Sequence, residues 1–176
     1  MKFAYLIEPP FNHRTANGTI TGSDVELARV VVEKLSVGGF EPIETEFSKL
    51  LPGVASGKWR MTTGLFATDE RKQNAAFSIP IWALPDGLLV PSGNPRELQG
   101  YRSVSNQEDC TLAVIRDQFQ HRSAVEFGVT ESQLRLFETY NDAANAVMEG
   151  NADAYASVGR AHTCLLYTSP SPRDRG

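Results

Sequence analysis

Short apolar runs alternate with helical patterns along this chain, and this alternation constrains the fold more than any other feature. Strands are predicted at residues 3–7, 40–47, 59–66, 83–91, 111–115, 134–138 and 153–158. Helices are predicted from Ser23 to the Gly38-Gly39 pair and over residues 48–57, 119–127 and 142–149. Strands that alternate with helices of this length indicate mainly parallel sheets, so the fold class is α/β.

Local signals place the helix ends and one buried face. Ser23 and Glu26 have the spacing of a capping box. Ser48 is predicted to cap the helix over residues 48–57, and Asn141 the helix over residues 142–149. The apolar stripe of the first long helix is predicted to be Ala28, Val31, Val32 and Leu35, because these positions share one helical face.

The alternation falls into two similar series. The joints "VASGKWRM" and "VMEGNADAY" each place a glycine between a helix and a strand. We therefore predict two α/β lobes, residues 1–90 and 96–164, with a turn-rich linker at 91–95. Lobes of this kind enclose a ligand at the carboxyl ends of their strands. Residues 165–176, "LLYTSPSPRDRG", lack any periodicity and are expected to be a non-native tail.

Composition excludes several classes of function. The 176 residues carry a net charge of −4 without a basic stripe, so nucleic acid is not an expected partner. Cys110 and Cys164 stand alone, which argues against a metal centre or a disulfide framework. The sequence has no GxSxG, HExxH, P-loop or GxGxxG motif, and its three histidines lie in polar segments. We expect no catalytic residue, metal or cofactor.

The segment "TDERKQNAAFSIPIW" has a positive charge near a helix N-terminus, where a negative charge is favoured. Thr68 is a good N-cap, and Asp69 and Glu70 suit the positive end of a helix. Arg71 stands at the third helical position, where a capping box has Glu or Gln. A guanidinium there is suited to bidentate capture of a carboxylate. The alternative is a local ion pair with Asp69, Glu70 or another residue of the lobe.

Three aromatic residues fall near predicted strand ends. Phe11 follows the double proline after the first strand, Phe47 ends the second and Phe66 ends the third. Since the carboxyl ends of parallel strands meet at one edge, these rings are candidates to line a cleft. Burial in the core is the competing interpretation.

Residues 1–163 resemble a known family. The motifs are "EPPF", "TGSDVELARVVVEKL", "FSKLLPGVASGKW", "TDERK" followed by "FSIPIW", and "MEGNADAY". They are similar to those of the family 3 solute-binding proteins of polar amino-acid ABC transporters. The resemblance implies a two-lobed periplasmic-binding-protein-like (type II) fold, which would be incomplete at its C-terminal end here.

The resemblance also implies a ligand site. Arg71 matches the family's carboxylate-binding arginine, and Phe11 and Phe47 match positions that pack on the ligand. The remaining matched positions, at strand ends and at the helix start of the second lobe, are Thr63, Gly64, Phe66, Gln118, Phe119 and Val158. Phe66, Gln118 and Phe119 replace smaller hydroxyl-bearing residues.

Val158 departs most from the family pattern, because many members have an Asp there against the ligand ammonium. Losing that charge partner removes a hydrogen bond of about 1.5–3 kcal/mol. An N-substituted, cyclic or opine-like ligand is therefore the working hypothesis.

The expected function is that of a solute-binding receptor that delivers an amino acid or related carboxylate to an ABC permease. The protein is expected to be a monomer in the periplasm, or lipid-anchored outside the cell. No signal peptide is seen in the sequence, and truncation is the expected reason. The alternatives are a dehydratase-like enzyme on the same fold and the input domain of a membrane sensor.

Overall fold

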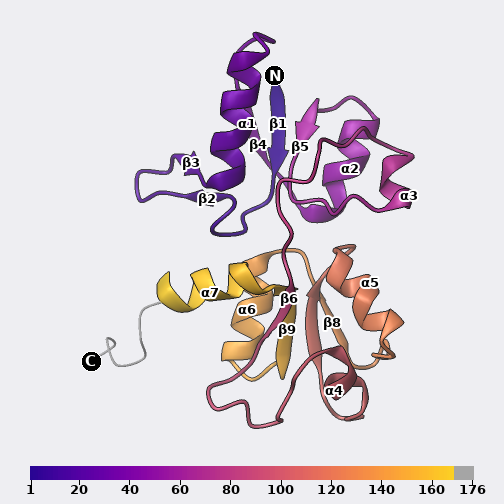
Figure 1. The fold of residues 1–176 in the computed structure, drawn as a ribbon. Helices are drawn as coiled ribbons and strands as arrows, with labels where there is room; N and C mark the ends of the chain where they lie inside the picture. Colours follow the sequence, from indigo (N-terminus) through magenta and orange to yellow (C-terminus); the bar gives the residue numbers. More distant parts are fainter. Residues whose placement is uncertain (169–176) are drawn as a thin grey trace.

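The computed structural model describes residues 1–168, and of residues 165–168 the backbone alone. The first sheet contains β1 (Lys2–Tyr5), β4 (Glu41–Glu44) and β5 (Met61–Thr62), all parallel, in the order β4-β1-β5. A hairpin of β2 (His13–Arg14) and β3 (Ile20–Thr21) lies beside it (Figure 1). The helices of this unit are α1 (Ser23–Lys34), α2 (Phe47–Ala55) and α3 (Asp69–Lys72).

The second sheet has the order β6-β9-β7-β8. Its strands are β6 (Asp86–Leu89), β7 (Leu112–Ile115), β8 (Leu134–Phe137) and β9 (Ala154–Val158). Three strands are parallel, and β6 alone runs antiparallel, beside β9. The helices are α4 (Tyr101–Ser105), α5 (Phe119–Glu126), α6 (Tyr140–Met148) and α7 (Gly159–Thr168). The α/β class and the two-lobed arrangement predicted from the sequence are confirmed (Figure 1).

The chain crosses between the two sheets earlier than the sequence suggested. Asp86 pairs with Val158, so β6 already belongs to the second sheet. Residues 76–85 contain no helix or strand and connect the two units (Figure 1). The linker expected at 91–95 therefore lies inside the second unit, before α4, a helix that the turn-rich composition concealed. Strand membership depends on a distant partner, which local composition does not reveal.

The first long helix begins differently from its prediction. Its N-cap is Gly22, and no side chain caps it. The backbone N–H groups of Ser23 and Asp24 donate instead to the carbonyls of Pro10 and Phe11, at 3.3 and 3.1 Å. Gly22 has φ 128°, and a Cβ there would lie 2.1 Å from the Phe11 oxygen. The loop after β1 thus takes the place of the expected Ser23–Glu26 capping box.

The buried stripe of α1 begins and ends about one turn earlier than predicted. Ala28 and Val32 are buried as expected and Val31 partly so, whereas Leu35 is 62% exposed. Val25, one turn earlier, is buried with Ala28 in the cluster that contains Phe3 and Tyr5. Leu35 is the C-cap of α1, beyond the stretch that covers the sheet.

Three further local predictions need correction. Phe47 is the first residue of α2, with Glu46 as N-cap, and does not end a strand. Thr139, rather than Asn141, caps α6, because its hydroxyl accepts from the Asp142 N–H. The helix α7 runs to Thr168, into the segment expected to be an aperiodic tail; the rest of that tail lies outside the described residues.

One apolar cluster joins the two units. It contains Leu6, Phe11 and Phe47 from the first unit together with Tyr155 and Val158 from the second. A second cluster fills the far side of the second sheet, and a third lies between β1 and α1. Because the first cluster is shared, the position of one unit against the other depends on packing as well as on the connecting chain.

Gly53 tests the packing of α2. A Cβ at Gly53 would lie 2.0 Å from the Trp59 ring, which is 2% exposed and donates its Nε1–H to the Leu50 carbonyl at 2.8 Å. We expect Gly53→Ala to lower the free energy of unfolding by about 1–3 kcal/mol, as overpacking does. Urea unfolding followed by circular dichroism measures this. Gly39→Ala is the matched control, since nothing lies within 4 Å of its added Cβ, and equal stability of the two variants would contradict the prediction.

Candidate functional site

Arg71 is held in place by its own short helix and by both units. The Thr68 hydroxyl accepts from the Arg71 N–H at 3.3 Å, which confirms the predicted N-cap. The guanidinium donates through Nη1 to the Phe66 carbonyl at 3.2 Å. Through Nη2 it donates to the Asp117 carbonyl, across the junction, at 3.0 Å. Asp117 presents that carbonyl from a left-handed backbone conformation with φ 63°.

The acidic neighbours of Arg71 are paired elsewhere. Glu70 forms an ion pair with Arg122 of α5 at 2.9 Å, and Asp69 forms one with Lys72 at 3.2 Å. Among the side chains of residues 1–164, no carboxylate forms an ion pair with Arg71. Burial lowers the pKa of Arg71 from its ordinary value, because desolvation penalises the charged form. The site therefore holds a partly desolvated cation whose guanidinium hydrogen bonds, within the described residues, go to carbonyl oxygens and not to a carboxylate of the lobe.

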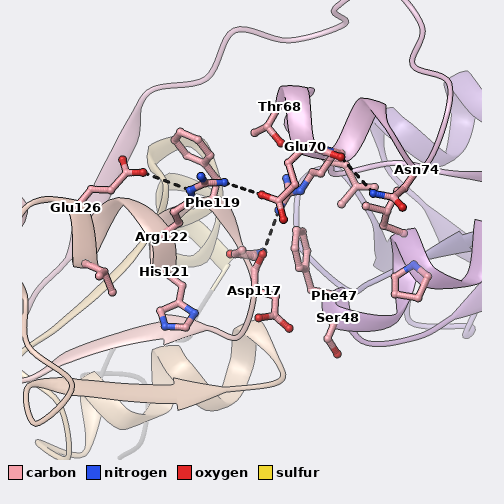
Figure 2. Close-up of a pocket in the computed structure, with 16 residues that line it drawn as sticks. Phe47, Ser48, Thr68, Glu70, Asn74, Asp117, Phe119, His121, Arg122 and Glu126 are labelled. Carbon is pink, nitrogen blue, oxygen red and sulfur yellow. Dashed lines mark hydrogen bonds and ion pairs between the residues drawn. The ribbon is translucent and has the colours of Figure 1, made fainter. Parts of the chain in front are cut away.

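A cavity of about 670 Å³ lies between the two units at Arg71. Figure 2 shows side chains from α2 and α3 on one side and from α5 on the other. Of the residues predicted from the sequence, the cavity is lined by Arg71, Phe47, Gln118 and Phe119.

Aromatic rings form part of the cavity wall. The Arg71 guanidinium carbon lies 5.4 Å from the centre of the Phe47 ring, within range of a cation–π contact. Phe66 does not line the cavity, but its ring lies 5.0 Å from that of Phe119, across the junction. The two rings are thus in contact between the units, so Phe66 packs against Phe119, a residue of the cavity wall.

Gln118 carries an unsatisfied polar atom in this wall. The residue is 5% exposed, and its Oε1 has no hydrogen-bond partner. It is the N-cap residue of α5 but makes no side-chain cap bond. A buried acceptor without a donor costs about 1–3 kcal/mol, so such an atom calls for a function. An N–H group of a ligand in the cavity would satisfy it.

Besides Phe66, four other predicted residues lie outside the cavity. Phe11 is buried, 6.3 Å from the Trp82 ring, and the Thr63 hydroxyl donates to the Asp24 carboxylate. Gly64 lies beside Leu6 with φ 75°, and Val158 is 6% exposed at the end of β9. Phe11 and Val158 belong to the apolar cluster that joins the units.

The sequence prediction missed the polar residues that surround Arg71. Arg122 and Glu126 project from α5 at steps of four residues after Gln118, so all three share one helical face. This spacing was the available signal. The other lining residues not predicted are Ser48, Leu51, Pro52, Leu65, Thr68, Glu70, Asn74, Asp117, His121 and Val125.

Residues 1–168 contain no group of His, Cys, Asp and Glu that could hold a metal ion. Across the same residues, no helix is both long and apolar enough to cross a bilayer.

Comparison with known proteins identifies the family of the chain. The sequence profile of the bacterial extracellular solute-binding proteins, family 3, matches residues 2–158. The chain belongs to this family. It is 32% identical over 154 residues to a probable amino-acid ABC transporter periplasmic-binding protein, y4tE, of Sinorhizobium fredii, covering 86% of this chain and 51% of that protein. It is 29% identical to the arginine-binding protein ArgT of Corynebacterium glutamicum, covering 85% and 50%.

Solved structures agree on the fold. A crystal structure of EhuB in complex with hydroxyectoine matches with a TM-score of 0.89 at 24% identity, covering 97% of this chain and 67% of that one. An ancestral amino acid-binding protein, AncCDT-1, described as a precursor of cyclohexadienyl dehydratase, matches with a TM-score of 0.86 at 25% identity, covering 95% and 73%. The chain spans about half the length of the curated relatives it matches.

The ion pair between Glu70 and Arg122 joins the two units but is exposed to solvent. Their side chains are 75% and 58% exposed. We expect Glu70→Gln to lower the free energy of unfolding by less than about 1 kcal/mol, and the difference to vanish at high salt, as for surface pairs. Urea unfolding at low and high ionic strength measures both. Glu126→Gln is the control, because Glu126 pairs with Arg122 within α5; a larger loss from Glu70→Gln that survives high salt would contradict this view.

Proposed function

We propose that this protein is the solute receptor of an ABC importer and binds an amino acid or amino-acid-like carboxylate between its two units. The observation that carries the proposal is Arg71, a partly buried guanidinium at the junction without a carboxylate partner among residues 1–164. A ligand carboxylate would replace the Asp117 carbonyl at Nη2 and make a charge-assisted bond, which is stronger than the bond it displaces.

The neighbours of Arg71 suit the rest of such a ligand. Gln118 offers its unpaired oxygen to an N–H group, and Phe47 offers an apolar face beside the carboxylate. Phe11, Thr63, Gly64, Phe66 and Val158 remain proposed site residues on the family pattern alone.

The proposed lobes follow the sheets. We assign the first lobe to residues 1–75 and the second to residues 86–164, with the connecting segment 76–85 as the hinge. The proposed setting is outside the cytoplasmic membrane, as the family description states for its members, with a membrane permease as partner and a monomeric receptor.

The proposed ligand class is the one that the sequence suggested. Relatives by name bind arginine, and a structural neighbour was solved with hydroxyectoine. Because Val158 offers no charge to an ammonium group, an N-substituted, cyclic or opine-like compound is proposed. Calorimetric titration with arginine, lysine and glutamine, beside N-substituted and cyclic analogues, tests this. Tight binding of a plain amino acid would overturn the ligand class while leaving the receptor role intact.

An enzyme on the same fold is the second candidate, since AncCDT-1 is described as a precursor of a dehydratase. Proton transfer needs an available acid or base in the cavity. Glu70 and Glu126 both pair with Arg122, which argues against these two carboxylates in that role. The lining also contains His121 and Asp117, which an enzyme would have to use instead.

Arg71→Ala tests the proposed carboxylate contact. We expect the affinity for any carboxylate ligand found in the titration to fall about tenfold or more, from loss of a charge-assisted bond. Arg60→Ala is the matched control, because Arg60 is exposed on the same lobe and away from the cavity. Equal affinities of the two variants would remove Arg71 from the site.

Gln118→Leu separates binding from stability. The change removes a buried, unpaired oxygen, so we expect the free energy of unfolding to stay level or rise by about 1 kcal/mol. Affinity for a ligand with an N–H group should fall, by about tenfold for one lost hydrogen bond. Thermal unfolding and calorimetry on the same variant check both, and a fall in stability with unchanged affinity would refute the assignment.

A further inference from the structure

Glu8 forms a direct hydrogen bond between the two units. It follows β1 and is 7% exposed. Its Oε1 accepts from the Ser157 hydroxyl of β9 at 3.1 Å. Its backbone is fixed by bonds with Asn12: the Glu8 N–H donates to the Asn12 carbonyl at 2.9 Å, and the Asn12 N–H returns to the Glu8 carbonyl at 3.1 Å. The carboxyl is therefore held rigidly on the first unit, against a side chain of the second.

The groups that face this carboxyl offer it no positive charge. Asp24 of α1 is an acid, and it accepts hydrogen bonds from Thr63 and from the Trp82 indole. Tyr155 of β9 and Tyr140 of α6 are buried phenols whose own pKa values are raised, first by burial and then by the charge of Glu8.

A basic side chain that packs against Tyr155 is also buried. His162 of α7 packs its ring 5.1 Å from that of Tyr155. Desolvation lowers its pKa. Within residues 1–164, Glu8 has no ion-pair partner. An ionised Glu8 would thus be a buried charge with one hydroxyl as its recorded hydrogen-bond donor, a costly arrangement.

Burial accordingly raises the pKa of Glu8 from its ordinary value of 4.5 to about 7. The Ser157 hydrogen bond acts in the opposite direction, and the nearby Asp24 adds a smaller rise. If the units separated at this contact, the carboxyl would meet water and ionise near its ordinary value. We call the arrangement with the Glu8–Ser157 contact closed and one without it open. The closed arrangement then binds a proton that the open arrangement releases.

We propose that Glu8 is a positioning residue that couples contact between the two units to uptake of a proton. Neutral Glu8 rests against Ser157 and favours the closed arrangement, whereas ionised Glu8 favours separation. Linkage gives the sign: between pH 4.5 and about 7, the closing equilibrium weakens as the pH rises, by up to about tenfold per pH unit, and it levels off above. This coupling does not require the ligand proposed above. It does mean that any ligand that closes the units binds more tightly at lower pH.

Small-angle X-ray scattering of the whole chain at pH 5.5 and 8.5 tests the coupling. The wild-type radius of gyration should be larger at pH 8.5, and Glu8→Gln should remain compact at both values because its side chain cannot ionise. Glu41→Gln, which removes an exposed acid from the same sheet, is the matched control and should behave as the wild type. Wild type and Glu8→Gln that vary alike with pH, or that do not vary at all, would overturn the proposal.

A second measurement tests the proposed role of Glu8 even if Glu8→Gln folds poorly. Carbon-detected NMR follows the Glu8 carboxyl of the unmodified chain, whose titration midpoint should lie near 7. In Ser157→Ala the midpoint should move higher, because the hydrogen bond that favours the ionised form is lost. A wild-type midpoint near 4.5, or the same midpoint in both proteins, would refute the role of Glu8.

Discussion

The guanidinium of Arg71 donates to the Phe66 carbonyl in its own unit and to the Asp117 carbonyl in the other. These two bonds fix Arg71 in the wall of the cavity between the units. Carbonyl oxygens satisfy its donors but carry no full charge. A cation held in this way keeps most of its capacity for an anion. Arg122 contributes by pairing with Glu70, the acid next to Arg71 in the chain. The unit across the junction thus fixes the arginine and also engages the acid nearest to it in sequence.

The main alternation of strands and helices was predictable because it depends on local periodicity, and so was the cap at Thr68, whereas the β2–β3 hairpin, α4 and α7 were missed. Predictions failed where a distant partner decides the outcome. The boundary at β6 depends on pairing with β9, and the start of α1 depends on carbonyls of Pro10 and Phe11. Neither partner can be deduced from the residues at the boundary itself.

The same distinction applies to the site. Arg71 stood out because its charge opposes a local rule, whereas Arg122 obeys the rules of its helix and gave no such signal. Phe11 and Phe66 lie in the loops after β1 and β5, beyond the strand ends where they were expected; Phe11 is buried beside Trp82, and Phe66 is partly buried beside Phe119. Residue type and position along the chain fix which edge a ring lies on. They do not fix which neighbour covers it.

Among the buried polar groups at the junction, Gln118 in the cavity wall has an acceptor oxygen without a partner, and the Glu8 carboxyl accepts from the Ser157 hydroxyl. Proteins tolerate such groups at functional sites and seldom elsewhere. Arg71 and Glu8 each touch the opposite unit through one hydrogen bond, the first as a cation and the second, under the proposal above, as a neutral acid. Under the two proposals, a ligand carboxylate would act on the first contact and a proton on the second, and both contacts depend on the same relative placement of the units. Since linkage is reciprocal, a ligand that closes the units must also raise the affinity of Glu8 for its proton.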